Sequence, residues 1–152
     1  MKELRIEDEI VVEAPPAMVW DAIADPVAHA AWHPFVTQIA GEHRLGAART
    51  CSVIAGKKSG ETRERCVEAD AGRAITWSID HDTTGFSRLV VRWRSGFDLQ
   101  QHDRGTLVRA RSAFEPRNIL VRAIMPPIAR KFHQVQREIL TALKGSVERQ
   151  AP

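Results

Sequence analysis

The sequence predicts an α+β fold in which a highly curved antiparallel sheet of about seven strands wraps around one long carboxyl-terminal helix. Three features predict it: a strand followed by two short helices, six strand-like runs joined by short turns, and an apolar stripe with helical spacing at the end of the chain. The 152 residues are 43% hydrophobic and 27% charged. This composition supports one core, so we expect a single domain over residues 1–152.

The amino-terminal segment contains the first strand and both short helices. In residues 5–14, apolar side chains alternate with glutamates, which is typical of a half-buried strand. Pro15 and Pro16 suit the first turn of a helix, and Pro26 ends that helix. A second short helix is expected over residues 27–32. The two helices therefore lie between the first and second strands of the predicted sheet.

Six strand-like runs follow, separated by turn residues. Their expected bounds are 36–43, 47–56, 61–70, 73–82, 88–100 and 105–115. Because the connections are short, we expect neighbouring strands to pair antiparallel. Pro126 and Pro127 precede an apolar stripe with a spacing of three or four residues, which predicts one face of a long helix. The stripe consists of Ile128, Phe132, Val135, Ile139 and Leu143.

Composition and charge exclude several classes of protein. The net charge is +3, but the 22 Lys and Arg residues are interspersed with 19 Asp and Glu residues. No zinc-finger, recognition-helix or RNA-binding motif is present, so we expect no nucleic-acid partner. No apolar run approaches the ~20 residues that a membrane span requires, and the charged amino terminus is unlike a signal peptide. We therefore expect a cytoplasmic protein without stable membrane insertion.

The cysteines and histidines do not predict a metal site. Cys51 and Cys66 form no CxxC pair, and no histidine has a ligand-like spacing to other candidate ligands, so we predict neither a metal nor another cofactor. An even closure of the hairpin about Lys58 and Ser59 places Cys51 opposite Cys66. We expect these thiols to be close together but reduced, because the cytosol disfavours disulfides.

One amino-terminal stretch, IVVEAPPAMVWDAIADPVAHAAWHPFV, resembles the START-like superfamily, also called polyketide cyclase/dehydrase and lipid transport (SRPBCC) proteins. The order of elements agrees with this resemblance over essentially the whole chain. The resemblance implies a helix-grip fold. It also implies binding of lipids, sterols, polyketides or plant hormones, or cyclisation of polyketides, without selecting among them. The matching motif residues are Val12, Ala14-Pro15, Val19-Trp20, Asp25-Pro26 and Trp32-His33-Pro34.

Alternation along the strands predicts which side chains face a cavity between sheet and helix. Symmetric closure of the loops places Trp77 opposite Trp93, Ile79 opposite Val91, Trp93 opposite Ser112, and Phe97 opposite Val108. Large and small residues then alternate at the centre of the sheet, as in a pocket wall, although filling of an ordinary core is an alternative interpretation. The expected ligand-binding residues are Trp32, His33, Phe35, Glu64, Trp77, Ile79, His81, Val91, Trp93, Ser95, Phe97, Ala110, Ser112, Phe114, Met125, Ile128 and Phe132.

Glu64 is the unusual member of this set. With the hairpin register above, it lies opposite Val53 and points inward with Cys51 and Cys66, whereas a slip of one residue sends Arg65 inward instead. An apolar cavity favours the neutral form of a carboxyl group, which makes Glu64 a candidate proton donor or ligand anchor. A solvated strand glutamate is the alternative interpretation.

The stretch AWHPFV connects the second short helix to the next strand. Pro34 fixes this turn, so we expect Trp32 to plug the end of the sheet, and His33 and Phe35 to shape the mouth of the cavity. His81 is expected near the rim. An exposed position in the turn is the alternative interpretation for His33.

Two functions follow from these residues. The first is binding or carriage of a small hydrophobic ligand, either a lipid or an aromatic, polyketide-like compound, by a monomer or homodimer. The second is a cyclase or dehydratase activity, for which Glu64, His33 and His81 are the acid–base candidates. The sequence contains no nucleophile elbow, phosphate-binding loop or catalytic triad order, so whether the chain is an enzyme stays open.

Overall fold

A computed structural model describes residues 2–152 and confirms the predicted helix-grip architecture. The seven strands are β1 (Leu4–Val12), β2 (Val36–Gly41), β3 (Ala48–Ala55), β4 (Lys58–Asp70), β5 (Ala74–Asp82), β6 (Val90–His102) and β7 (Gly105–Pro116). The helices are α1 (Pro16–Ala24), α2 (Pro26–Trp32), α3 (Ile119–Ala123) and α4 (Met125–Gln150), with a 3₁₀ turn, η1 (Phe86–Arg88). Neither α3 nor η1 is predicted by the sequence pattern, and α4 begins before the predicted apolar stripe.

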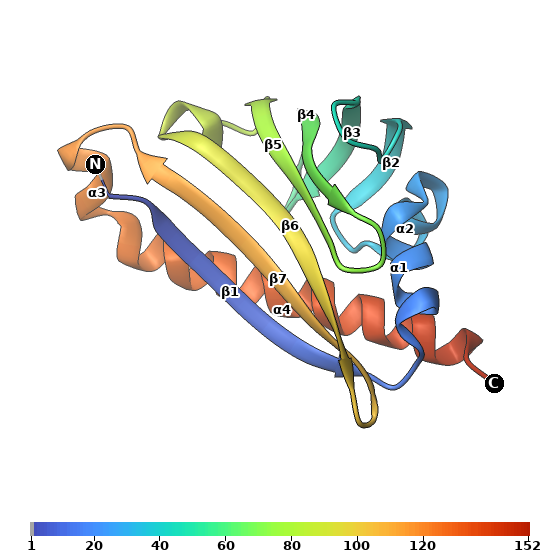
Figure 1. Ribbon diagram of the computed structural model, residues 1–152. Coiled ribbons are helices and arrows are strands. Elements are labelled where there is room, and N and C mark those ends of the chain that lie inside the picture. The colour runs from blue at the N-terminus through green and yellow to red at the C-terminus, as the bar shows by residue number, and fades with distance from the viewer. Residues whose placement is uncertain (1) are drawn as a thin grey trace.

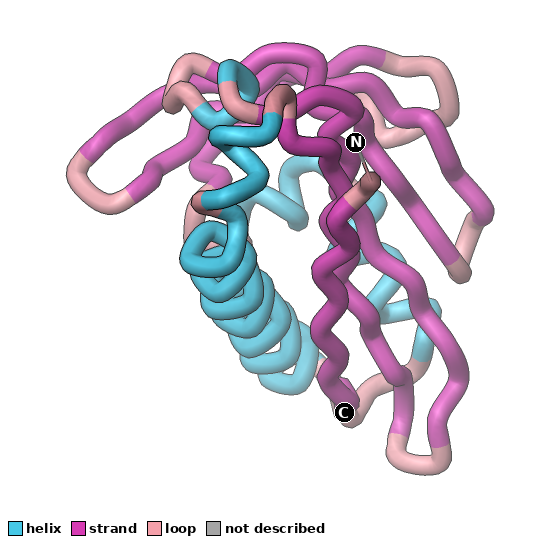
Figure 2. The backbone as a smooth tube through the Cα atoms, turned by 90° about the vertical axis from the view of Figure 1, so that its left-hand side faces the viewer, coloured by secondary structure: helices cyan, strands magenta, loops and turns pink. Residues whose placement is uncertain are grey.

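The strands form one antiparallel sheet in the order β1-β7-β6-β5-β4-β3-β2. Figure 1 shows α4 running along the concave side of the sheet, beneath β1 and β7, while α1 and α2 lie near its carboxyl-terminal end. In Figure 2 the sheet arches over the axis of α4. Side chains on β7 are buried at every second position from Thr106 to Pro116, so this strand directs one face toward the interior.

The register differs from the symmetric prediction in every hairpin that was assigned. Trp77 pairs with Ser95 rather than Trp93, and Phe97 pairs with Ala110 rather than Val108. Each of these pairings is shifted by two residues, an even number, so the same faces still point inward. Ile79 and Trp93 likewise do not take the partners that symmetric closure predicts.

The β3–β4 hairpin turns earlier than predicted. Ala55 pairs with Lys58, so the turn consists of Gly56 and Lys57, and Gly56 adopts a positive φ of 63° that glycine tolerates without strain. Cys51 consequently lies opposite Thr62, not Cys66, and Val53 lies opposite Gly60, not Glu64. The prediction that the cysteines lie side by side is wrong.

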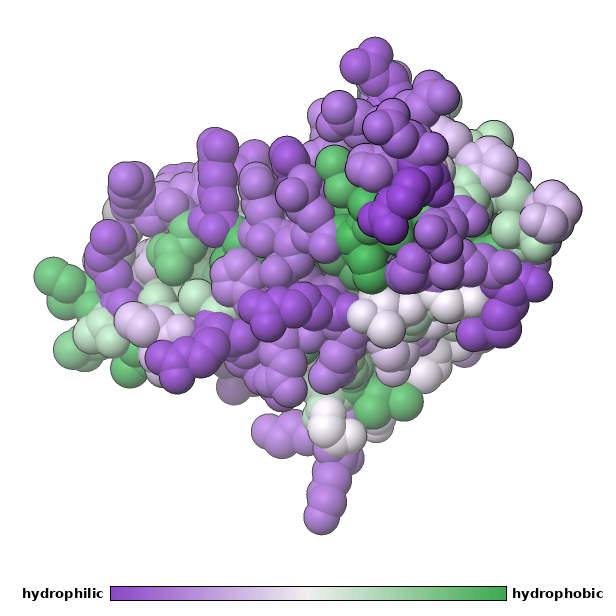
Figure 3. All heavy atoms as spheres, turned by 90° about the horizontal axis from the view of Figure 1, so that it is seen from below, coloured by the Kyte–Doolittle hydropathy of each residue, from purple (hydrophilic) through white to green (hydrophobic). Residues whose placement is uncertain are grey.

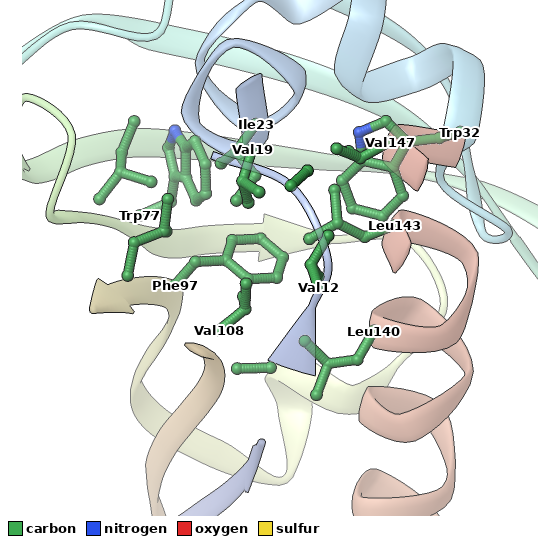
Figure 4. Packing of buried hydrophobic residues seen from close by; sticks show 14 of the residues in the cluster. Val12, Val19, Ile23, Trp32, Trp77, Phe97, Val108, Leu140, Leu143 and Val147 are labelled. Atoms are coloured by element: carbon green, nitrogen blue, oxygen red, sulfur yellow. The ribbon is translucent and has the colours of Figure 1, made fainter. Parts of the chain in front are cut away.

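The interior contains two apolar clusters. The larger one, here called the main core, is built from α1, α2, the central strands and the carboxyl-terminal half of α4 (Figure 4). It contains Val12, Ile23 and Leu143, each of which is fully buried. The second, here called the aromatic cluster, lies beside the amino-terminal half of α4. Its rings, which contact one another, are Phe86, Trp93, Phe114 and Phe132.

Candidate ligand-binding site

A cavity of about 110 Å³ lies between the concave face of the sheet and α4. Apolar and polar side chains both line it, the apolar ones coming mainly from the sheet. A long helix crossing a curved sheet leaves such a space because the two surfaces diverge. The lining residues are His29, His33, Val36, Arg49, Glu64, Trp77, Ser95, Gly96, Phe97, Ala110, Arg111, Ser112, Gln136 and Ile139.

A buried ion pair forms part of the cavity wall. Arg49 Nε and Nη2 donate to Glu64 Oε1 at 3.0 and 2.7 Å, and both residues are less than 10% exposed. The other carboxylate oxygen of Glu64 accepts a hydrogen bond from Thr62 Oγ1 at 2.5 Å. The Arg49 guanidinium also lies 3.7 Å from the centre of a Trp77 ring, a cation–π contact. Glu64 points inward, as predicted, but it is a paired anion rather than an isolated carboxylic acid.

Two histidines are held in defined tautomers beside this ion pair. His29 Nδ1 and His43 Nδ1 both lie within hydrogen-bonding distance of the Ile23 carbonyl oxygen, at 2.9 and 3.1 Å. A carbonyl only accepts, so Nδ1 carries the proton in each ring. His43 Nε2 accepts from Arg49 Nη1 at 2.7 Å. Burial, followed by the charge of Arg49, lowers the pKa of His43 to about 4. Burial likewise lowers the pKa of His29 well below its usual value.

The third histidine, His33, has the opposite tautomer. Its Nδ1 accepts hydrogen bonds from the backbone N–H groups of Phe35 and Val36, both at 3.0 Å. The ring proton therefore lies on Nε2. Burial and the nearby Arg49 charge lower the pKa of His33 to about 3, so the imidazole is neutral near pH 7. Pro34 makes this geometry accessible, because His33 has the extended backbone that precedes a proline.

The indole of Trp77, which lines the cavity, is a hydrogen-bond donor without an acceptor in the described part of the chain. Trp77 is 1% exposed, and no group among residues 2–152 accepts a hydrogen bond from its Nε1–H. A buried N–H without a partner is costly, because it has lost its hydrogen bonds to water. The Trp77 indole, which is one of the groups that line the cavity, is therefore an unsatisfied donor.

A polar network joins the cavity to α4. Ser112 Oγ donates to Gln136 Oε1 at 2.8 Å, and Gln136 Nε2 donates to Asp8 Oδ2 at 2.8 Å. Gln136 is 4% exposed and stands between apolar positions of the helix. This network fixes the helix against β1 and β7 at the level of the cavity.

The structure places seven of the sequence-predicted ligand-binding residues on the cavity wall. They are His33, Glu64, Trp77, Ser95, Phe97, Ala110 and Ser112. Trp32 is 8% exposed and donates from Nε1 to the Ala22 carbonyl at 2.8 Å, so it is a plug in the main core, as predicted, and does not line the cavity. The Phe35 ring contacts His33 but does not line the cavity. Ile79 is buried and pairs with Glu64 in the sheet, and it does not line the cavity either.

Five other predicted residues belong to the second interior cluster instead. They are Trp93, Phe114, Met125, Ile128 and Phe132. The cavity does not extend to them, because Phe86 from η1 fills the space between Trp93, Phe114 and Phe132. The sequence pattern does not predict η1, so it could not predict this filling.

Two predicted site residues point away from the interior. An irregularity in the β4–β5 register turns His81 outward, where it is exposed, and buries Asp82 instead. In β6, a bulge near Arg92, whose φ is 53°, reverses the alternation. Val90 is therefore buried and Val91 pairs with Glu115 on the outer face. The predictions for His81 and Val91 are wrong.

Several lining residues were missed. Arg49 has the same parity as Cys51 and Val53 in β3, so extending the assigned inward face by one position would have found it. Gln136 was missed because the search along the last helix followed apolar residues only. His29 gives no signal in the sequence, since its role depends on the packing of α2 against the sheet.

Both cysteines are buried free thiols. Burial, followed by the neighbouring Glu64 charge, raises the pKa of the Cys51 thiol to about 12, and burial raises the pKa of Cys66 as well. Neither thiol is therefore activated as a nucleophile. Across residues 2–152, no group of three or more His, Cys, Asp or Glu side chains is arranged to hold a metal ion. Within the same range, no helix combines the length and apolar character needed to cross a bilayer.

Solved structures with this fold include proteins of different kinds. The ZhuI aromatase/cyclase from Streptomyces sp. R1128 superimposes with a TM-score of 0.76, 18% identity, and coverage of 98% of this chain and 96% of that chain. Major latex-like protein 151 from Panax ginseng gives a TM-score of 0.78 at 9% identity, covering 95% and 97%. Protein CV1439 from Chromobacterium violaceum gives 0.73 at 22% identity, covering 95% and 96%. The TM-scores show a shared fold, and at these identities they show the fold alone.

Comparison with curated protein sequences finds no significant match. The family model described as polyketide cyclase / dehydrase and lipid transport matches residues 3–148, which is nearly the whole chain. With the sheet wrapped around α4 and a cavity between them, this match shows that the chain belongs to the polyketide cyclase / dehydrase and lipid transport family.

Proposed function

We propose that this chain binds one small, neutral, mostly apolar molecule that carries an oxygen acceptor, in the cavity between the sheet and α4. The observation that carries the proposal is the pair of donors on the cavity wall. Trp77 Nε1–H is buried without a partner, and His33 offers Nε2–H because its Nδ1 already accepts two backbone hydrogen bonds. A ketone, ether or phenol oxygen satisfies such donors, while Phe97, Ala110 and Ile139 contact the apolar part.

The charges around the cavity support a neutral ligand. Arg49 is neutralised by Glu64, and the lowered pKa values of His33 and His43 keep both rings uncharged near neutral pH. A carboxylate ligand would therefore meet no free cation, and a cationic ligand would meet no free anion. Burying an unpaired charge there costs several kcal/mol.

The size of the cavity supports a ring-sized molecule. Its volume of about 110 Å³ is smaller than the ~150 Å³ apolar cavity that holds benzene in an engineered protein. A molecule of about six non-hydrogen atoms is thus the largest that the cavity accepts without movement. A lipid or a multi-ring polyketide requires the wall formed by α4 to move.

Cyclase or dehydratase chemistry is the second candidate function. The family description and the Streptomyces aromatase/cyclase are consistent with it, and the cavity contains polar groups that could orient a reactive chain. General acid–base catalysis works best with a pKa near the operating pH. His33 and His43 have pKa values of about 3 and 4, and Glu64 is held by Arg49, so these groups favour orientation over proton transfer. We therefore place binding first.

The proposal also includes a cytoplasmic location and a monomeric or homodimeric state. Two free, buried cysteines are compatible with a reducing compartment. Sedimentation velocity measures the oligomeric state.

The proposal is tested with a matched pair of ligands, cyclopentanone and methylenecyclopentane, which differ by an oxygen in place of a CH₂ group. We expect cyclopentanone to bind about 5- to 10-fold more tightly, the effect of one neutral hydrogen bond or slightly more. Titration followed by the ¹⁵N-¹H resonance of the Trp77 indole gives both the affinity and the site, because a new hydrogen bond shifts that resonance.

Trp77→Phe is expected to reduce the preference for the ketone, because only the His33 Nε2–H donor then remains, and Trp93→Phe serves as the matched control. Trp93 also has a buried indole N–H without a partner, but it lies in the aromatic cluster and does not line the cavity. Equal affinities of the unaltered chain for the two ligands, or a preference that is undiminished in Trp77→Phe, contradicts the proposal.

A further inference from the structure

The corner between β7 and α4 exposes a group of large apolar side chains. Ile119 and Leu120 in α3 are 72% and 77% exposed, and Ile124, which follows α3, is 49% exposed. Figure 3 shows hydrophobic residues projecting from the end of the molecule at which α3 lies in Figure 1. Large apolar side chains gathered at one exposed tip usually mark an interaction site. We call these three residues the α3 tip.

Three cationic side chains lie within or shortly after the α3 tip along the chain. Arg122 lies within the same turn of chain, and Arg130 and Lys131 are exposed on the first turns of α4. Residues 116–137 contain no Asp or Glu. Within the described part of the chain, none of these three cations has an ion-pair partner. By contrast, arginines on the outer sheet face, such as Arg109, pair with carboxylates.

The shape and size of the α3 tip argue against a protein partner. The three apolar side chains project outward instead of lining a groove. A stable protein–protein interface buries about 800 Å² on each partner, which is far more than three side chains provide. A convex, apolar point flanked by cations instead suits the boundary between lipid headgroups and acyl chains, where the apolar groups insert and the cations meet anionic headgroups.

We propose that the α3 tip docks this protein reversibly on the surface of an anionic lipid bilayer. Ile119, Leu120 and Ile124 enter the interfacial region, and Arg122, Arg130 and Lys131 contact lipid phosphates. Next to the tip, Val121 and Ile128 pack against Phe114 and the rest of the aromatic cluster. In the docked protein, the aromatic cluster is therefore the part of the interior nearest to the membrane. This inference does not depend on the identity of the cavity ligand.

The experiment measures co-sedimentation of the full chain with vesicles of phosphatidylcholine alone and of phosphatidylcholine with 30% phosphatidylglycerol. We expect at least tenfold tighter binding to the anionic vesicles, lost at 0.5 M NaCl because salt screens the headgroup charge. The double variant Ile119→Ser/Leu120→Ser should lose at least tenfold in affinity. Val27→Ser is its control, since Val27 is 79% exposed but lies on α2, at the other end of the molecule (Figure 1).

A charge-matched pair of variants tests the cations. Arg130→Glu/Lys131→Glu should abolish binding to anionic vesicles, whereas Arg63→Glu/Arg104→Glu changes the net charge equally at exposed sites away from the tip and should preserve most of it. All the substituted positions, including those of the controls, are exposed. The variants are therefore expected to fold.

Three outcomes overturn the inference. The first is no binding of the unaltered chain to anionic vesicles. The second is binding that Ile119→Ser/Leu120→Ser weakens no more than Val27→Ser does. The third is a dimer in sedimentation velocity that dissociates in the Leu120→Ser variant, which would assign the tip to a second copy of this chain.

Discussion

The two halves of α4 pack against the same sheet but are buried to different extents. In the carboxyl-terminal half, Leu140, Leu143 and Val147 are no more than 2% exposed. In the amino-terminal half, Ile128, Phe132 and Val135 are only partly buried, although they belong to the same apolar stripe. The helix therefore has one closed end, in the main core, and one loosely covered end, beside the aromatic cluster.

The difference follows from what fills the space between a curved sheet and a straight helix. At the closed end, α1 and α2 both contact α4 and occupy that space. At the loosely covered end, only the short segments α3 and η1 are present, and α3 leaves four of its five residues exposed. The cavity lies between these ends, where α2 reaches it only through His29 and the adjoining His33. Stability is thus expected to depend mainly on the closed end.

The largest effect that we expect is a loss of folding stability at acid pH. It tests the closed end, which contains His29, His33 and His43. Their pKa values are lowered in the folded chain, to about 3 for His33 and about 4 for His43, from an ordinary value of 6.5. Below pH 6.5 the unfolded chain therefore binds up to three more protons than the folded chain. Stability should fall with decreasing pH, by at most about 4 kcal/mol per pH unit near pH 5.

Urea unfolding at pH 8, 6 and 5 measures this dependence. His43→Gln should reduce the slope below pH 6.5 by about one proton. A free energy of unfolding that stays constant from pH 8 to pH 5 means that these three rings are not held neutral in the folded chain.

The next largest effect is expected from removing the plug at the closed end. Trp32→Ala removes a ring that is 8% exposed, together with the hydrogen bond from Nε1 to the Ala22 carbonyl. We expect a loss of about 3–5 kcal/mol, the usual cost of deleting a large core aromatic. Chemical denaturation gives the value.

His33→Ala, at the adjacent position, is compared with Trp32→Ala. It should weaken binding of cyclopentanone without a comparable loss of stability, since His33 lines the cavity and is only partly buried. If His33→Ala destabilises the chain as much as Trp32→Ala and binds the ketone normally, His33 is a structural residue.

Sequence patterns predicted the seven strands, the two short helices, the last helix and most of the inward faces. Alternation in β4 and β5 identified Glu64 and Trp77 as inward-facing, and the register errors did not change this because they were shifts of two or four residues. The motif around Trp32 correctly indicated a buried plug. Alternation along strands and apolar spacing along helices recur throughout each element. The inward faces can therefore be predicted from the sequence.

Features that depend on loop geometry were not accessible. The turn at Gly56 set the β3–β4 register and separated the cysteines by four positions along β4, roughly 13 Å. Local irregularities in β5 and β6 turned His81 and Val91 outward. Such irregularities leave no reliable signal in a single sequence, because they arise from the curvature that the whole sheet requires.

The smallest expected effect compares the two halves of α4 directly, through Leu143→Ala and Phe132→Ala. Leu143 is fully buried in the main core, so its truncation should cost about 2–5 kcal/mol. Phe132 is larger but only partly buried against Phe86 and Trp93, so its truncation should cost about 1–2 kcal/mol, below the usual range for a buried Phe.

Phe132→Ala should also leave the affinity for cyclopentanone unchanged, because Phe132 does not line the cavity. Urea unfolding and ligand titration of both variants measure these values. A cost for Phe132→Ala equal to or above that of Leu143→Ala would mean that the amino-terminal half of α4 is as closely packed as the carboxyl-terminal half, and the distinction between the two ends would fail.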